Sequence, residues 1–209
     1  MNHMDIINKY FKELTDTQRQ QLEQLDALYR EWNAKINVIS RKDIDNLYEH
    51  HVLHSLAIAR AYHFQPNTRI LDFGTGGGFP GIPLAIMLPQ CTFKLIDGTG
   101  KKIRVAQEVI NSIGLKNCKA VHLRGEEEHG QYDFIVSRAV MPLPDLLKIV
   151  RKNISRQQHN VIGNGVICLK GGNIEGETND FRNQVEIEEI SQWFEEEWFK
   201  EKYVVYIPV

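Results

Sequence analysis

The chain of 209 residues lacks the features that mark secreted, membrane-spanning or metal-binding proteins. Its three cysteines (Cys91, Cys118 and Cys168) are isolated and form no C-x-x-C pair. No apolar run reaches the roughly 18 residues that a transmembrane helix needs, and the first five residues do not have the pattern of a signal peptide. Repeats and low-complexity linkers are also missing. We therefore expect a cytoplasmic monomer with reduced thiols, no bound metal and no contact with a membrane.

Charge is distributed unevenly, although the formal net charge is only −2. Residues 171–209 hold 10 acidic and 3 basic side chains, a net charge of −7, whereas residues 1–170 hold 17 and 22, a net charge of +5. A mildly basic body is compatible with a nucleic-acid partner, but the excess is too small to require one.

The first 62 residues have the pattern of helices. Thr15 and Gln18 have the spacing of a capping box, and apolar residues then recur at three- and four-residue steps. After a polar break at about 37–42, a second helix is expected from about 43 to 61. We interpret residues 1–62 as an N-terminal helical cap and residues 63–209 as one compact unit.

From residue 69 onward, short apolar runs alternate with helical patterns, which predicts an α/β domain with a doubly wound, mostly parallel sheet. The expected strands and helices are 69–73, 81–88, 92–97, 101–113, 119–123, 132–137, 142–154 and 165–170 in chain order. Two further strand-like runs, 185–190 and 203–207, are expected to form a hairpin on one sheet edge. We expect Trp193, Phe194 and Trp198 to pack against that edge.

The most informative segment is the glycine-rich turn after the first expected strand. The strand ends in Asp72, and Gly74, Gly76 and Gly78 follow at alternate positions before a proline-marked helix start. Glycine adopts positive φ and lets a ligand approach bare backbone. Ligands of open α/β sheets bind at the carboxyl ends of the strands. The turn therefore predicts a nucleotide-sized site.

Two cofactors are compatible with this turn. Residues 76–81 match the dinucleotide pattern G-x-G-x-x-G, with Asp97 about 20 residues further on, as in NAD(P)-dependent oxidoreductases. The competing pattern, alternate glycines after Asp72 and a second acid closing the next strand, is typical of S-adenosylmethionine-dependent methyltransferases. Because the chain holds no Tyr-x-x-x-Lys donor pair, methyl transfer is favoured. An RNA-binding module with a vestigial pocket is a third hypothesis.

The segments 72–85 and 132–143 strongly resemble the RsmG (GidB) family of bacterial methyltransferases that act on small-subunit ribosomal RNA. Weaker matches occur in the family's order at 37–40, 51–56, 100–102, 124–126 and 169–171. The resemblance implies a class I, Rossmann-like methyltransferase fold with S-adenosylmethionine as cofactor. It also implies 16S rRNA or the small ribosomal subunit as partner, and N7 of a guanosine as the methyl acceptor.

Candidate site residues come from the glycine pattern and from the resemblance. The pattern contributes Asp72, Gly76, Gly78 and Asp97, and the resemblance implies cofactor contacts at Gly74, Phe79, Gly125, Glu126 and Arg138. Arg138 is the one catalytic candidate, and a surface salt bridge to Glu126 or Asp133 is the alternative interpretation. Three positions depart from the family pattern, which usually has Asp at His54, Ala at Gly125 and Ser at Gly98.

Guanine N7 carries an in-plane lone pair and no proton, so direct SN2 attack on a sulfonium methyl group needs no general base. The enzyme then has to align and desolvate the two reactants. Contacts to RNA phosphates are expected from basic side chains near the site: Arg41, Lys42, Lys101, Lys102 and Lys170. His50, His51 and His54 have helical spacing but no accompanying carboxylate or thiol signature, so we interpret them as packing or polar surface residues.

Overall fold

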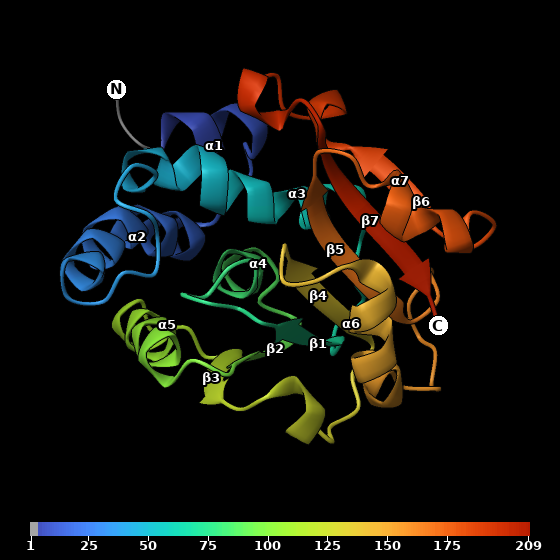
Figure 1. Ribbon diagram of the computed structural model, residues 1–209. Helices are drawn as coiled ribbons and strands as arrows, with labels where there is room; N and C mark the ends of the chain where they lie inside the picture. The colour runs from blue at the N-terminus through green and yellow to red at the C-terminus, as the bar shows by residue number, and fades with distance from the viewer. Residues whose placement is uncertain (1–3) are drawn as a thin grey trace.

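A seven-stranded sheet in the order β3-β2-β1-β4-β5-β7-β6 forms the centre of the computed structural model, which describes residues 4–209 (Figure 1). The parallel strands are β1 (Arg69–Phe73), β2 (Thr92–Asp97), β3 (Cys118–His122), β4 (Phe134–Arg138) and β5 (Gly165–Gly171). Strands β6 (Glu186–Glu189) and β7 (Lys202–Pro208) form an antiparallel pair beside β5. The predicted doubly wound sheet and its edge hairpin are thus confirmed.

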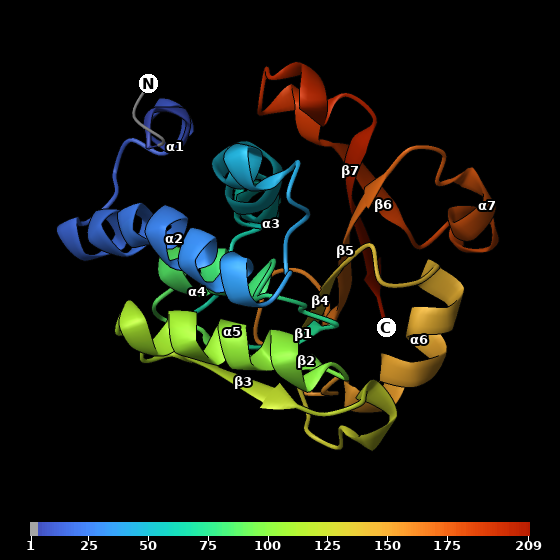
Figure 2. The ribbon, with the colours of Figure 1, turned by 60° about the vertical axis from the view of Figure 1, so that its left-hand side comes forward.

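Helices cover both faces of the sheet, with α4 (Gly81–Met87) and α5 (Gly100–Ser112) on one face and α6 (Leu143–Val150) and α7 (Glu175–Thr178) on the other (Figure 2). Side chains alternate along each strand, so β1 contributes to two apolar clusters. Ile70 belongs to the cluster that includes α4 and α5, whereas Leu71 and Phe73 belong to the cluster around α6. Strand order reverses at β1, which lies between β2 and β4 and marks the expected ligand site.

The N-terminal region consists of α1 (Asp5–Tyr10), α2 (Asp16–Lys35) and a second helical stretch. The predicted capping box is confirmed: the Gln18 N–H donates to the Thr15 hydroxyl at 3.2 Å. The second stretch, predicted as one helix, has three consecutive parts: η1 (Ile44–Asn46), the π-helical η2 (Leu47–Leu53) and α3 (His54–Ala61). Figure 2 shows α2 and α3 beside α4 and α5, and their buried side chains share one apolar cluster.

Aromatic residues between β6 and β7 pack against the N-terminal helices. Phe194 contacts Tyr10 with ring centroids 4.8 Å apart, and Trp198 stacks on His50 at 4.2 Å. Figure 1 shows this segment beside α1. Phe194 and Trp198 thus have ring partners in the N-terminal region that the expectation of packing on the sheet edge did not include.

The three cysteines are buried and form no disulfide. Burial raises the pKa of the Cys91 thiol to about 11 and that of Cys168 to about 12, which favours the unreactive thiol form. Among residues 4–209, no helix has both the length and the apolar character needed to cross a membrane.

Candidate functional site

Asp72 holds the glycine-rich turn between β1 and α4. Its Oδ2 accepts hydrogen bonds from the Thr75 hydroxyl at 2.6 Å and from the Gly81 N–H at 2.7 Å, which joins the strand end to the helix start. The side chain is fully buried, and Oδ1 has no hydrogen-bond partner among the described residues. Burial raises the pKa of Asp72 to about 7. From its buried position, Asp72 therefore stabilises the turn through these two hydrogen bonds.

Gly74, Gly76 and Gly78 adopt φ values of 69°, 58° and 117°, in the left-handed region that favours glycine. A Cβ at Gly74 would fall 2.6 Å from Cγ2 of Val140, so the loop after β4 touches bare backbone there. A Cβ at Gly76 would meet nothing within 4 Å. The turn thus presents backbone and open space, as the sequence predicts.

A cavity of about 240 Å³ lies where β1, β2 and the segment after β3 end. Four of the residues predicted to bind the cofactor line it: Gly74, Asp97, Gly125 and Glu126. The other predicted residues of the turn, Asp72, Gly76, Gly78 and Phe79, support the turn and are not part of this lining, and neither is Arg138. The structure therefore divides the predicted site into a cavity and a second cluster.

Asp97, at the end of β2, accepts a hydrogen bond from the glycine-rich turn. Its Oδ2 accepts from the Gly76 N–H at 2.9 Å, and its Oδ1 accepts from the Thr99 N–H at 2.8 Å. Each carboxylate oxygen can accept more than one hydrogen bond, so Asp97 can also accept from sugar hydroxyls. A carboxylate at the rim of a glycine-walled cavity fits the nucleoside of S-adenosylmethionine.

The Phe73 ring packs against Gly125, one of the positions expected to depart from the family pattern. Gly125 begins the 3₁₀ turn η3 (Gly125–Glu127), and a Cβ there would collide with the Phe73 ring. The ring lies in the cavity wall and is 6% exposed. The Phe73 ring of β1 therefore occupies the space that a side chain at position 125 would need.

Arg138 ends β4 and contacts the N-terminal region. Its Nη1 donates to the His50 carbonyl at 3.3 Å, and its Nη2 lies 3.0 Å from Nδ1 of His51. The guanidinium also lies over the Phe79 ring, 5.3 Å from the centroid. Burial lowers the pKa of Arg138. The alternative interpretation, a surface salt bridge to Glu126 or Asp133, is not what the structure shows.

Asp43 accompanies these histidines. Its two oxygens lie 2.5 Å from Nδ1 of His50 and 2.6 Å from Nε2 of His51. His54 is buried, and its Nε2 has no partner among the described residues. No group of metal-binding side chains occurs in residues 4–209. Asp43 was not among the predicted site residues, because nothing in its local sequence distinguishes it from the neighbouring acids.

Helix α2 supports the glycine turn directly. The Tyr29 hydroxyl donates to the Gly77 carbonyl at 2.8 Å, and the Tyr29 ring packs on Phe79 at 4.9 Å. Val38, just after α2, lies so close to Gly77 that a Cβ there would be 2.9 Å away. The cap is therefore part of the wall that shapes the site.

Four of the five predicted RNA-binding side chains lie just after α2 or in the first turn of α5. Arg41, Lys42 and Lys101 are exposed, and Lys102 is half-buried in the first turn of α5. The ends of α2 and α5 meet here, since the Arg104 guanidinium lies 6.0 Å from the Trp32 ring (Figure 2).

Lys170 is the exception among these cations. Its ammonium is buried and donates to the Met141 carbonyl and to Glu177, both at 2.7 Å. The structure places it inside the fold, so Lys170 does not belong to the exposed basic surface.

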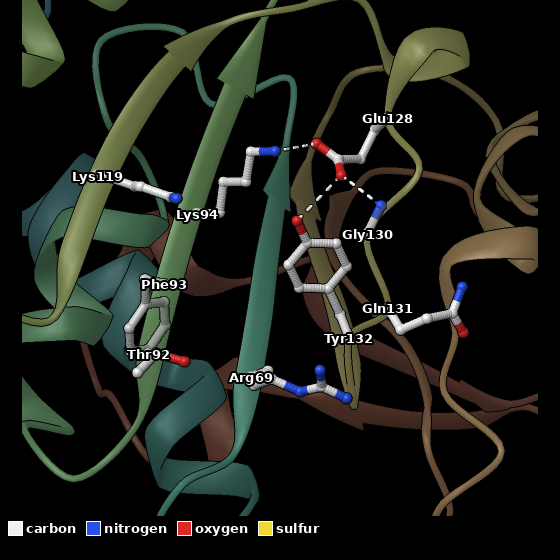
Figure 3. A pocket seen from close by; sticks show the side chains of 9 residues that line it. All are labelled: Arg69, Thr92, Phe93, Lys94, Lys119, Glu128, Gly130, Gln131 and Tyr132. Atoms are coloured by element: carbon white, nitrogen blue, oxygen red, sulfur yellow. Dashed lines mark hydrogen bonds and ion pairs between the residues drawn. The ribbon is translucent and has the colours of Figure 1, made fainter.

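A second groove, of about 390 Å³, lies at the opposite end of the strands (Figure 3). Glu128 closes it by accepting from Lys94 at 2.5 Å, the Gly130 N–H at 2.6 Å and the Tyr132 hydroxyl at 3.2 Å. Ligands of this kind of fold bind at the carboxyl ends of the strands. We therefore place the site at the smaller cavity.

Comparison with known proteins gives the family. The profile described as "GidB: rRNA small subunit methyltransferase G" matches residues 18–202. The chain belongs to this family. A relative from Bacteroides thetaiotaomicron, named "Ribosomal RNA small subunit methyltransferase G", is 61% identical over 97% of this chain and 98% of its own length. A relative of the same name from Porphyromonas gingivalis is 57% identical over 98% and 93%.

Solved structures share the fold at low sequence identity. An S-adenosylmethionine-dependent methyltransferase from Aquifex aeolicus aligns with a TM-score of 0.55 and 17% identity over 81% of this chain and 98% of its own. Fibrillarin from Aeropyrum pernix, solved with S-adenosylmethionine bound, aligns with a TM-score of 0.54 and 10% identity over 74% and 73%. The predicted fold, that of class I methyltransferases, is confirmed.

Proposed function

We propose that this protein transfers the methyl group of S-adenosylmethionine to N7 of a guanosine in 16S rRNA, as free RNA or within the small ribosomal subunit. The observation that carries the proposal is a glycine-walled cavity, closed by Asp97, next to the Arg138 guanidinium at the neighbouring strand end. Membership of the GidB family supports the class of substrate. Such a substrate places the protein in the cytoplasm.

The residues of the cavity fit the methyl donor. Gly74 and Gly125 let Val140 and Phe73 pack closely in the cavity wall, Asp97 offers acceptors for ribose hydroxyls, and Glu126 lies in the same lining. S-adenosylmethionine supplies an electrophilic methyl group on a sulfonium, so the protein needs only to hold donor and acceptor in line and exclude water.

The side chains near Arg138 match an acceptor that has no proton to lose. Both nitrogens of His51 are engaged, one with Arg138 and one with Asp43, so His51 is not available as a general base. Guanine N7 needs none. Arg138 has five N–H donors, of which the described residues engage two, so it can also donate to guanine O6 or to an oxygen of the donor.

Four basic side chains that follow α2 or begin α5 would hold the RNA backbone. Arg41 and Lys42 follow α2, and Lys101 and Lys102 begin α5, which directly follows the strand that ends at Asp97. Phosphate contacts position an RNA without reading its sequence, and they make binding weaker at high salt.

The test is methylation of small ribosomal subunits, and separately of their extracted RNA, from a strain that lacks this protein. We expect one guanosine to gain a radiolabelled methyl group at N7, located by chain cleavage at that base. Arg138→Ala should reduce kcat/KM by about 100-fold or more, because a charged hydrogen-bond donor is lost. Methylation at another atom, or full activity of the variant, would contradict the proposal.

Two alternatives are decided by thermal unfolding with and without ligands. Stabilisation by S-adenosylhomocysteine, and none by NAD or NADP, is the expected result, because a ligand stabilises the fold that binds it. Stabilisation by NAD alone would favour an oxidoreductase. RNA binding without methyl transfer would favour a non-enzymatic module with a vestigial pocket.

A further inference from the structure

We propose that Asp43 and His51 are positioning residues that hold the Arg138 guanidinium at the edge of the methyl-transfer site. The three side chains form a chain of hydrogen bonds, 2.6 Å from Asp43 Oδ2 to His51 Nε2 and 3.0 Å from His51 Nδ1 to Arg138 Nη2. The inference rests on the proposed role of Arg138, because it assigns to the N-terminal region the task of orienting that side chain.

The donor and acceptor groups of these three side chains determine which atom carries the proton in each of the two hydrogen bonds. A guanidinium has donors and no acceptor, so Nδ1 of His51 must accept from Arg138. Its Nε2 therefore carries the proton and donates to the Asp43 carboxylate. Only one tautomer of a neutral imidazole satisfies both contacts, and Asp43 selects it.

The surroundings of His51 favour that neutral form. Its side chain is 12% exposed, and its ring packs on Phe79, with centroids 5.3 Å apart. Burial, together with the charge of Arg138, lowers the pKa of His51 to about 4. The imidazole is thus uncharged at neutral pH and can accept from Arg138 without repelling it.

His50 also contacts both Arg138 and Asp43. Its carbonyl accepts from Arg138 Nη1 at 3.3 Å, its Nδ1 lies 2.5 Å from Asp43 Oδ1, and its ring stacks on Trp198. Two consecutive residues reach one carboxylate within the π-helical segment η2, and such segments are often found at functional sites.

The arrangement orients Arg138 without neutralising it. A carboxylate in direct contact would compensate the guanidinium charge, whereas here an imidazole separates Asp43 from Arg138. Three N–H donors of Arg138 have no partner among the described residues, so a fixed and still charged guanidinium is available to a ligand. Its orientation comes from residues almost ninety positions earlier in the chain.

The experiment is a double-mutant cycle between positions 51 and 138, read as methyl groups transferred to total RNA of a strain lacking the protein. His51→Phe keeps a flat ring and removes both hydrogen bonds, so kcat/KM should fall by about 30-fold. His51→Asn keeps an acceptor at the position of Nδ1 and should restore activity to within about 5-fold of the wild type. Asp43→Asn should lie between the two.

The decisive result is the effect of His51→Phe in the Arg138→Ala background. If His51 acts through Arg138, the second substitution should change kcat/KM by less than about 2-fold there, because interacting sites are not additive. Asp45→Asn and His63→Asn are matched controls at exposed positions of the same region and should keep wild-type activity.

Three results would overturn the proposal: wild-type kcat/KM for His51→Phe, additive losses in the double variant, or no recovery by His51→Asn when both His51 variants melt at the wild-type temperature. Failure of the proposed function has a different signature. If the wild type methylates another RNA atom, the cycle is still read from the incorporated label. If it methylates no RNA, the same cycle on S-adenosylhomocysteine affinity decides the role of His51.

Discussion

The two halves of the site are built in opposite ways. The cavity at Gly74, Asp97 and Gly125 is lined by glycines and by other residues at and after the ends of adjacent parallel strands. The cluster around Arg138 is made of side chains from the sheet and from the N-terminal region. The first half depends on turn geometry, whereas the second depends on the docking of a separate helical segment.

Because of this difference, we expect the two halves of the site to respond differently to amino-acid substitutions. The cavity should be sensitive to an added side chain at Gly74 or Gly125, where a Cβ would collide with Val140 or Phe73. The Arg138 cluster should lose its orientation when one hydrogen bond between its side chains is removed. Substitutions in the two halves should therefore fail in different measurements, and four experiments test this contrast.

The largest effect is expected from Asp72→Asn, which removes a buried carboxyl group. Because the pKa of Asp72 is raised to about 7, its ionisation opposes folding, and wild-type stability should fall as the pH rises from about 4 to above 7. Relative to the wild type, the variant should gain up to about 4 kcal/mol across that range. Urea unfolding at pH 4.5, 6 and 8 measures this. A difference that does not change with pH would contradict it.

Gly125→Ala tests the cavity wall. The new methyl group would overlap the Phe73 ring, and such overpacking costs about 1–3 kcal/mol. We expect S-adenosylhomocysteine to bind at least about 5-fold more weakly in calorimetry, with little change in the cluster around Arg138. The double variant Phe73→Leu with Gly125→Ala should regain affinity. If the alanine variant binds normally, the Phe73 ring does not define this wall.

Tyr29→Phe tests the link between the two halves. Losing the hydrogen bond to the Gly77 carbonyl should reduce stability by about 1 kcal/mol and weaken S-adenosylhomocysteine binding, because the glycine turn loses its support. Tyr48→Phe is the matched control, since its hydroxyl donates to the Leu22 carbonyl at 2.7 Å within the cap. The control should lose stability while keeping ligand affinity. Equal affinity losses in both variants would place the effect in the whole cap.

The smallest effect is expected at the two lysines that begin α5. Lys101→Ala and Lys102→Ala should each flatten the dependence of log K on log salt for RNA binding by about 0.7–0.9, as expected for one lost phosphate contact. Lys148→Ala on α6, where the side chain is 76% exposed on the other face of the sheet, is the control. If both lysine variants keep the wild-type slope of log K against log salt, α5 is not part of the proposed RNA surface.

Much of the fold could be predicted because its signals are local. The strand at 69–73 and the alternate glycines lie within a few residues of one another, and β1 was predicted to the residue. The predicted strand at 132–137 starts two residues early, because Tyr132 pairs with Ile154 only as an isolated bridge before β4 begins at Phe134. Local patterns locate elements well and their ends less well.

In the second half of the site Arg138 was predicted, but its partners could not be, because they are distant in sequence. Nothing near Asp43 indicates that it shares a carboxylate between two histidines, and nothing near Lys170 indicates that its charge is enclosed by Glu177. Burial of a charged side chain is decided by whichever element packs over it, and Lys170 lies under the loop after β4 and α7.

By itself, the sequence determined the alternation of strands and helices, the positive-φ turn and the acids that close two strands, since each depends on neighbours along the chain. The tertiary structure alone decided which cations stay exposed, where Arg138 points and which helical segment orients it. The physical reason is the distance in sequence between the residues that interact. Backbone conformation is set mainly by adjacent residues, whereas the partner and the burial of a side chain are set by segments that meet only when the chain is folded.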